Sequence, residues 1–446
     1  MTFASIKNIA TSMHNPIQFK AFTSWRGGSY LFCLIWAVVS PLILSAQTIP
    51  PSIPLTQNIK SLTIISGDRW RDLPIITLNS QEVINIDFDD MTHQYHRYTY
   101  SLQHCDADWT PSDQLLTSDF LDGFQSGNTI DNIHESINTT HLYTHYNIQI
   151  PNPKCQPKIS GNYRLTVIDQ DNDDQPVLQA HFMILKPEMS LTLTASANTD
   201  IDNRNAHQQL SMTLHFNSLS VTNPAQQIRT VVIQNENPYT TVINPTPQST
   251  RPDALQWTHA PELIFPAKNE FRKFEILDPH LPALGIDSIT WDGQAYHAYA
   301  TPCEERRSYV YDQDADGAYL IRNQYYNNPE YLADYLFVHY TLISPILENQ
   351  DIYIGGRFTQ YQCLPEYQMS YNNVSRTYQA TILQKQGYYN YSFLTTLPDN
   401  TITSLFTEGN FYQTQNVYDA FVYYRPLGAR TDYLVAYQHI DTSLQP

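Results

Sequence analysis

Residues 95–105 read YHRYTYSLQHC, and this stretch decides the fold class. Side chains of a β-strand point alternately to opposite faces, so residues two apart share a face. One face would carry mostly aromatic and aliphatic side chains, namely His96, Tyr98, Tyr100, Leu102 and His104. The other would carry polar side chains, namely Arg97, Thr99, Ser101 and Gln103. Alternation sustained over this length predicts a half-buried strand.

The same alternation recurs along the chain. It appears around residues 146–150, 163–167, 210–216, 335–342, 351–358, 377–383 and 388–395. Hairpins are predicted at 309–321, around the sequence DQDADG, and at 419–440, around Arg425-Pro426-Leu427-Gly428. Only short helices are expected, near 112–120 and 329–334. Short strands separated by polar turns predict an all-β fold of tandem immunoglobulin-like β-sandwich domains.

The chain has 446 residues, more than one hydrophobic core usually serves. Composition shifts and turn clusters predict a signal peptide and three sandwich domains. The predicted ranges are 1–46 for the signal peptide, 47–187 for the first sandwich, 188–303 for the second and 304–446 for the third.

The predicted signal peptide centres on the apolar run 30–46, YLFCLIWAVVSPLILSA, which follows Lys20 and Arg26. A basic start, an apolar run and small closing residues are typical of secretory signals, and we expect cleavage after Ala46. Ser40 and Pro41 interrupt the run, which is too short for a membrane-spanning helix. Leu31 and Phe32 stand where a lipoprotein signal needs small residues before Cys33. We therefore expect an exported, unlipidated protein.

Charge and cysteine content narrow the function classes further. The formal net charge of −18 argues against nucleic acid as a partner, because phosphate binding needs a basic surface. Four cysteines follow the predicted signal: Cys105, Cys155, Cys303 and Cys363. Export permits disulfides, and pairing within domains would join 105 to 155 and 303 to 363. Four buried thiols are an equally acceptable interpretation.

Residues 104–109, HCDADW, bring together residue types used in nucleophilic catalysis. Neighbouring residues of a strand point to opposite faces, so His104 and Cys105 would not reach each other. Asp106 and Asp108 flank a strand end, where Asp commonly satisfies turn amides. No catalytic residue and no cofactor are expected.

Asp312, Asp314, Asp316 and Gly317 match the start of a calcium-binding loop. The twelfth position of such a loop needs a bidentate Glu, and here it is Asn323. The flanking residues look like strands rather than helices, so a hairpin turn is the preferred interpretation. These three aspartates remain weak metal candidates.

Four strings identify the first sandwich more specifically: HCDADWTPSD (104–113), LDGF (121–124), ESINTTHLYTHYNIQIPN (135–152) and SGNYRLTVID (160–169). Over residues 55–186 they resemble the first domain of the type IX secretion system plug family of Bacteroidota, formerly a domain of unknown function. QNENPY (234–239), LIFPAKNEFRKFE (263–275) and residues 408–438 look like later parts of the family. Thr431-Asp432 departs from the family pattern, which tends to have Tyr before the Asp.

The family motif is not a known catalytic site, so its residues carry over only as fold-defining or interface candidates. These candidates are His104, Cys105, Asp106, Trp109, Ser112, Asn138, Tyr143, His145, Tyr146, Gly161, Asn162, Tyr163, Asn269, Glu270, Phe271 and Arg272.

The resemblance implies a non-enzymatic periplasmic plug that closes the periplasmic side of a giant outer-membrane β-barrel translocon. It also implies association with the outer membrane through that barrel and a monomeric state when free. A secreted glycan-binding or glycan-processing sandwich protein is the alternative. It would be favoured by an exposed aromatic row beside a cleft that holds two carboxylates. A cargo protein of the same system is disfavoured, because no linker precedes the C-terminal strands.

Overall fold

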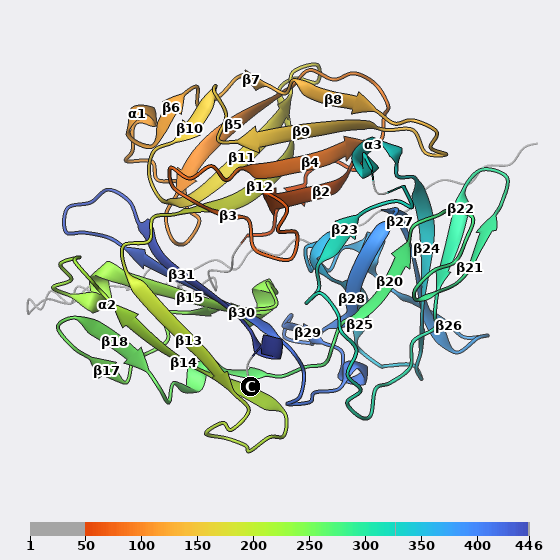
Figure 1. Ribbon diagram of the computed structural model, residues 1–446. Coiled ribbons are helices and arrows are strands. Elements are labelled where there is room, and N and C mark those ends of the chain that lie inside the picture. The colour runs from red at the N-terminus through yellow and green to blue at the C-terminus, as the bar shows by residue number, and fades with distance from the viewer. Residues whose placement is uncertain (1–49, 326, 445–446) are drawn as a thin grey trace, which may run out of the picture. The chain divides into compact units, whose positions relative to one another are not determined.

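The computed structural model describes residues 50–325 and 327–444, within one compact unit, Gln47–Pro446. The predicted signal peptide lies outside the described residues. Antiparallel strands dominate, and they form three sandwiches (Figure 1). The all-β prediction is confirmed, since each α-helix is only four residues long: α1 (Thr117–Phe120), α2 (Pro224–Gln227) and α3 (Pro329–Leu332). None of the described helices has the length and apolar character needed to cross a bilayer.

Sandwich 1 consists of two main sheets that enclose one core. One sheet has the order β1-β12-β11-β5-β7, with β3 added parallel to β12, and the other has the order β2-β4-β9-β8; β6 and β10 pair separately. The predicted alternation is present, because Tyr98, Tyr100 and Leu102 are buried in the core between the sheets. The strands are β1 (Ile53–Pro54), β2 (Ile59–Ser66), β3 (Ile75–Thr77), β4 (Ile84–Asp90), β5 (Tyr98–Cys105), β6 (Leu121–Gly123), β7 (Asn128–Thr129), β8 (Asn132–Glu135), β9 (Thr144–Ile150), β10 (Cys155–Pro157), β11 (Gly161–Asp169) and β12 (Gln175–Leu185).

Sandwich 2 is built from two separate stretches of the chain. One sheet has the order β13-β14-β18-β17, with β19 on β14, and the other has the order β16-β15-β30-β31. Its core joins residues such as Trp257 and Leu214 to Tyr418 and Val435 near the C-terminus. The strands are β13 (Ser190–Ser196), β14 (His207–His215), β15 (Ile228–Gln234), β16 (Val242–Ile243), β17 (Ser249–Thr250), β18 (Ala254–Trp257), β19 (Ile264–Pro266), β30 (Val417–Tyr424) and β31 (Tyr433–Asp441).

Sandwich 3 is inserted between β19 and β30. One sheet has the order β21-β22-β24-β27-β26, and the other is organised around β28, which pairs with β20, β23, β25 and β29. The strands are β20 (Arg272–Ile276), β21 (Ile286–Trp291), β22 (Tyr296–Ala300), β23 (Tyr319–Ile321), β24 (Tyr335–Ile343), β25 (Asp351–Gly355), β26 (Ser370–Asn372), β27 (Thr377–Lys385), β28 (Gly387–Thr396) and β29 (Ile402–Ser404).

Three expectations differ from these pairings. The expected boundary at 303/304 falls inside sandwich 3, because β22 before it pairs with β24 after it. The C-terminal hairpin is present as β30 and β31, but β30 pairs with β15 and so completes sandwich 2. The hairpin expected at 309–321 is absent: only 319–321 form a strand there, and it pairs with β28. Local alternation indicates strands but does not choose their partners.

Candidate functional site

An apolar cluster joins sandwich 1 to sandwich 2. Trp109 and Met183 of sandwich 1 pack there with Phe421, Tyr423 and Leu434 of the C-terminal hairpin. All five side chains are at most 5% exposed, so this contact excludes water. The C-terminal hairpin therefore belongs to two cores at once, that of sandwich 2 and this junction.

A polar network surrounds this cluster and uses the family-signature residues. Asp106 accepts hydrogen bonds from Ser112 Oγ at 2.9 Å and from Thr431 Oγ1 at 2.7 Å. Arg425 contacts both Asp106 and Asp432, with nitrogen–oxygen distances of 2.7 Å in each case. Asp432 Oδ2 also accepts the backbone N–H of Ala107 at 3.0 Å. Residues 104–109 (HCDADW) are thus the part of sandwich 1 that contacts the turn between β30 and β31.

His104 lies inside this network as a neutral group. Its Nδ1 is 2.9 Å from Ser112 Oγ, and its Nε2 is 3.3 Å from the Ser160 carbonyl oxygen. Burial lowers the pKa of His104 to about 4, although the nearby carboxylates of Asp106 and Asp432 favour protonation. Gly161 has a φ of +144°, and a Cβ there would lie 2.3 Å from His104 Nε2. Only glycine allows this approach.

Asn162 completes the contact between sandwich 1 and the hairpin. Its Nδ2 donates to the Asp106 carbonyl at 2.9 Å, and its Oδ1 accepts from Tyr423 Oη at 2.9 Å. Asn162 and Tyr423 are both buried. The amide therefore has partners on both sides of the junction.

A second junction joins sandwich 1 to sandwich 3, and it is built on charge. Lys385 Nζ lies 2.5 Å from Asp89 Oδ2, and both side chains are at most 2% exposed. Asp89 also accepts from Tyr335 Oη at 2.7 Å and lies 2.8 Å from His145 Nδ1. Burial disfavours the charged carboxylate, but Lys385 and His145 hold the pKa of Asp89 below its ordinary value. Burial also opposes protonation of His145, but hydrogen bonds to Asp87 and Asp89 raise its pKa to about 9.

The 136–143 segment extends this second junction. Asp334 accepts the backbone N–H of Thr140 at 2.9 Å and its hydroxyl at 2.8 Å. Tyr143 Oη donates to the Ala333 carbonyl at 2.7 Å. Asn138 is exposed and has a φ of +58°, which turns the loop between these contacts. Asn138, Tyr143 and His145 therefore lie on or beside one interdomain contact.

The NEFR stretch, residues 269–272, marks the crossing from sandwich 2 to sandwich 3. Asn269 Nδ2 donates to the Glu408 carbonyl at 2.9 Å, and Arg272 Nε lies 3.1 Å from the Glu408 carboxylate. Glu270 accepts from Tyr309 Oη at 2.6 Å and from the backbone N–H of Gln415 at 3.1 Å. The outgoing and returning segments of the chain are therefore tied together at this crossing.

Arg357 connects all three sandwiches at a single side chain. Its Nη1 donates to the Arg71 carbonyl of sandwich 1 at 2.7 Å and lies 2.9 Å from Glu236 Oε1 of sandwich 2. Arg357 itself belongs to sandwich 3. The three domains therefore meet as one packed body.

The predicted calcium loop lies beside this point but has a different organisation. Asp314 accepts the backbone N–H groups of Phe271 and Asp316, whereas Asp312 lies 2.5 Å from Lys273 Nζ. Burial raises the pKa of Asp314 well above its ordinary value and that of Asp316 to about 7, with Arg357 opposing the latter shift. The Asp312 and Asp314 carboxylates bind separate protein partners, and the described carboxylates of this loop do not converge on a common point.

One other group has suitable ligands for a cation. His96, Asp169 and Asp171 place their ligand atoms within 4.8 Å of one another, as no other three described His, Cys, Asp or Glu residues do. His96 Nδ1 already lies 3.1 Å from Asp169 Oδ2. The arrangement therefore also suits a simple imidazole–carboxylate pair.

The remaining candidates lie in cores rather than at a surface. Cys105, Tyr146 and Tyr163 are fully buried in sandwich 1, and Phe271 packs in a small cluster with Tyr361. All four described cysteines are free thiols, so the disulfide interpretation is wrong for this structure. Burial raises the pKa of the Cys105 thiol to about 11, with the nearby Arg164 opposing the shift, so a reactive thiolate is disfavoured.

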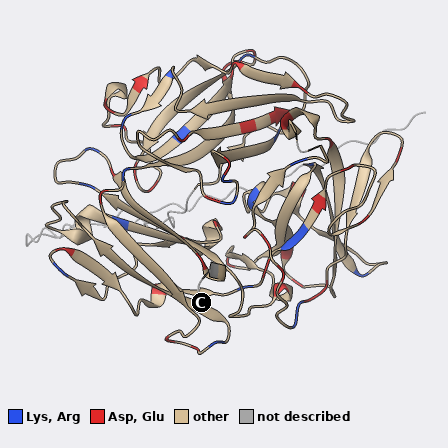
Figure 2. Ribbon diagram, in the orientation of Figure 1, with Lys and Arg blue, Asp and Glu red and all other residues tan. Residues whose placement is uncertain are grey.

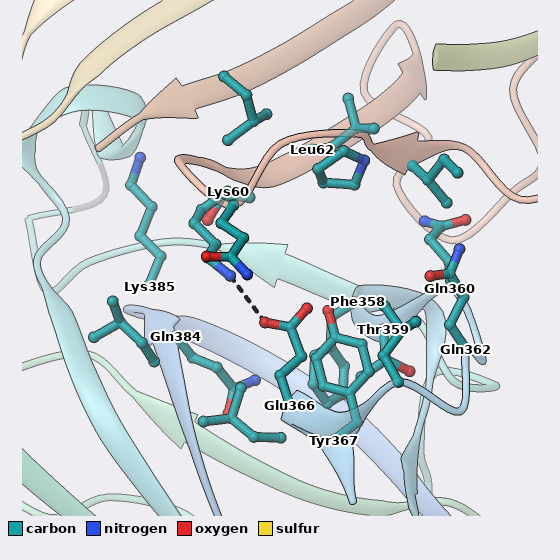
Figure 3. A pocket seen from close by; sticks show the side chains of 18 of the residues that line it. Lys60, Leu62, Phe358, Thr359, Gln360, Gln362, Glu366, Tyr367, Gln384 and Lys385 are labelled. Carbon is teal, nitrogen blue, oxygen red and sulfur yellow. Dashed lines mark hydrogen bonds and ion pairs between the residues drawn. The ribbon is translucent and has the colours of Figure 1, made fainter. Parts of the chain in front are cut away.

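A cavity of about 790 Å³ lies where the β1–β2 segment of sandwich 1 faces sandwich 3 (Figure 3). Lys60 Nζ and Glu366 Oε2 meet across it at 3.0 Å, as the dashed line in Figure 3 marks. Its walls combine aliphatic and hydroxyl side chains with aromatic and amide ones, the latter being Tyr319, Tyr335, Phe358, Tyr367, Tyr389, Gln57, Gln360, Gln362 and Gln384. Glu366 is the only carboxylate in the lining. Paired acid catalysis has no basis in this cavity.

The sequence analysis did not identify the residues that sandwiches 2 and 3 contribute to their junctions with sandwich 1. Lys385 ends β27, where residues 378, 380, 382 and 384 face inward, so the alternation assigns Lys385 to the other face and gave no sign that it is buried. Its partner Asp89 is 296 positions away, and no local pattern connects them. Thr431, where the sequence departs from the family pattern, is fully buried and donates a hydrogen bond to Asp106.

Lys and Arg are dispersed over the ribbon in this view rather than gathered in a stripe (Figure 2).

Comparisons with known proteins match sandwich 1 in one case and most of the chain in another. The family described as type 9 secretion system plug protein, 1st domain, matches residues 59–186, which contain all strands of sandwich 1 except β1. The crystal structure of a hypothetical protein from Parabacteroides merdae matches with a TM-score of 0.84 and 34% identity, covering 87% of this chain and 98% of that one. The collagen adhesin of S. aureus matches at 8% identity and a TM-score of 0.10, too weak for any argument. No curated protein matches. This chain belongs to the type 9 secretion system plug protein family.

Proposed function

We propose that this protein is a non-enzymatic periplasmic plug that closes the periplasmic side of the type IX translocon barrel. The observation that carries the proposal is family membership, with the plug domain matching residues 59–186. Export by the predicted signal peptide and association with the outer membrane through the barrel are parts of the same proposal.

The three junctions support this role physically. A protein that blocks a wide pore must keep its domains in fixed positions. Here buried polar contacts join each sandwich to the other two. Several signature residues, such as Asp106, Asn162 and Asn269, contribute to the contacts between sandwiches. Release of cargo then requires the whole protein to dissociate from the barrel, so the interface between them must be reversible.

The glycan alternative has no specific observation in its favour. Rings of Tyr299, His339, His297 and Phe337 form a row on the outer side of sandwich 3. They stack on one another, with the Tyr299 and His339 centroids 4.5 Å apart, so the faces between neighbouring rings are occupied. Sugar binding uses open ring faces.

The test is purification of C-terminally tagged protein from native outer membranes in gentle detergent, followed by mass spectrometry. Co-purification of a very large β-barrel is the expected result. A soluble periplasmic species without any barrel would contradict the proposal, and glycan binding and hydrolysis would then be tested.

A further inference from the structure

The cavity in Figure 3 is bounded by an incomplete sheet. β27 pairs with β24 along its whole length, from Thr377 to Lys385. On its other side β26 pairs only with residues 377–379. The chain before β26 turns away, since the N–H of Met369 donates to the Ile352 carbonyl of β25. Residues 380–384 therefore have a strand on one side alone.

The hydrogen-bond alternation shows which backbone groups face the cavity side. Cys303 N–H donates to the Thr341 carbonyl, and Ile343 N–H donates to the Cys303 carbonyl, so odd-numbered residues of β24 bond away from β27. Even-numbered residues of β24 then pair with the even-numbered residues of β27 opposite them. The N–H and C=O groups of Thr381 and Leu383 consequently point to the side that β26 leaves open.

Those groups belong to residues that line the cavity. Thr381 and Leu383 are both in its wall, and no described residue forms a backbone hydrogen bond with either on this side. Unpaired N–H and C=O groups on a strand edge are a template for another strand. Only a polypeptide carries donors and acceptors at the spacing that continues such a ladder.

A side chain in the same wall also lacks a partner. Gln384 is 5% exposed, and its Oε1 accepts from Tyr340 Oη at 2.6 Å. Its Nε2 is buried without any hydrogen-bond acceptor. A buried amide donor without a partner is costly unless a ligand or water satisfies it.

The charges of the lining define the occupant further. Lys60 and Glu366 neutralise each other, and Lys385 is held by Asp89. The remaining lining consists of neutral amide, hydroxyl, aromatic and aliphatic side chains. An uncharged extended segment fits such a lining, whereas a charged one would lack a counter-charge.

We propose that the free edge of β27 at Thr381 and Leu383 captures an extended, uncharged polypeptide segment of the translocon barrel as an added strand within this cavity. This inference rests on the proposed plug function and names the contact by which the plug would hold its partner. The segment would occupy the place that β26 leaves open. Its side chains would meet the tyrosines and glutamines opposite.

Hydrogen–deuterium exchange with single-amide resolution tests the added strand directly. The mature protein is compared free and bound to the purified barrel. We expect the Thr381 and Leu383 amides to slow by about tenfold or more in the complex, because each gains a ladder hydrogen bond. The Ile382 and Gln384 amides pair with β24 in both states and serve as internal controls.

Variants provide the second arm of the test. Leu383→Pro removes the outward N–H while sparing the ladder to β24, since proline is tolerated on strand edges. Gln362→Trp fills the cavity from the opposite wall and leaves the strand untouched. Each should weaken barrel binding by about tenfold, the scale of one or two lost hydrogen bonds. Val374→Trp, at a position 96% exposed on the β26–β27 turn, is the matched control.

The outcomes separate the two proposals. Binding with slowed exchange at Thr381 and Leu383, weakened by Leu383→Pro and Gln362→Trp but not by Val374→Trp, supports the added strand. Undiminished binding by both variants, with unchanged exchange at these amides, overturns the added strand and leaves the plug function standing. Absence of any binding to the barrel overturns both.

Discussion

Sandwich 1 packs against sandwich 2 and against sandwich 3 through two junctions that differ in their chemistry. Toward sandwich 2 it presents a neutral imidazole, its part of an apolar cluster, and Asp106, which pairs with the partly exposed Arg425 of sandwich 2. Toward sandwich 3 it presents Asp89, paired with Lys385 and His145 out of contact with water. The first junction depends mainly on burial of apolar area, the second on satisfied charge. Removing one partner should therefore lower the free energy of unfolding far more at the second junction than at the first.

Lys385→Met should show the largest effect. It leaves the buried Asp89 without its lysine and with His145 as its remaining charged partner, which costs about 3–5 kcal/mol of stability at this junction. Chemical denaturation, with exchange of β27 amides as a local readout, measures the loss. Lys154→Met, which removes an exposed pair with Asp131, should cost about 0–1 kcal/mol. Equal losses in the two variants would contradict the charged-junction account.

The two junctions should also respond to pH in opposite directions. The folded pKa of His145 is about 9, above the ordinary 6.5, so its contribution is complete below pH 6.5 and is lost as pH rises toward 9. The folded pKa of His104 is about 4, so its contribution is complete above pH 6.5 and is lost as pH falls toward 4. Each shift corresponds to roughly 3 kcal/mol.

Local hydrogen exchange separates these two responses, once intrinsic rates are corrected for pH. Amides of β9 should lose protection at pH 9, and those of β5 at pH 4.5. His145→Gln should remove the pH dependence of exchange only in β9, and His104→Gln only in β5. A common response of both junctions would show that pH acts on the whole body instead.

Tyr423→Phe should have an intermediate effect at the neutral junction. It removes the hydroxyl that donates to Asn162 Oδ1 and leaves that buried acceptor without its donor, at about 1–3 kcal/mol. Urea unfolding measures the change. Tyr95→Phe, at a residue 72% exposed, is the control and should be neutral. A loss as large as that of Lys385→Met would remove the distinction between the junctions.

Lys60→Met should have the smallest effect. The Lys60–Glu366 pair also joins sandwich 1 to sandwich 3, but its side chains are 28% and 47% exposed. Such pairs contribute about 0–1 kcal/mol and are screened by salt. Thermal unfolding in low and high salt should show a small difference that disappears at high salt. A difference independent of salt would indicate that the aliphatic stem, not the charge, supports the cavity wall.

Much of the strand content and part of the site were predictable from sequence. The alternation of Tyr163, Leu165 and Val167 in β11 directly reflects burial of one face, which is a local property. The signature string also identified residues that meet at the junctions, because a family motif preserves residue order. What it could not identify was the partner of each, such as Thr431 for Asp106 or Lys385 for Asp89.

By itself, then, the sequence determined the strands, the all-β class and the family, because period-two burial and motif order are written along the chain. Only the tertiary structure decided that the C-terminal hairpin completes sandwich 2, that the cysteines remain thiols and that β27 keeps a free edge. Each of these depends on contacts between residues far apart in the chain. Strand alternation specifies which face is buried, whereas the choice of neighbour follows from the packing of the whole body.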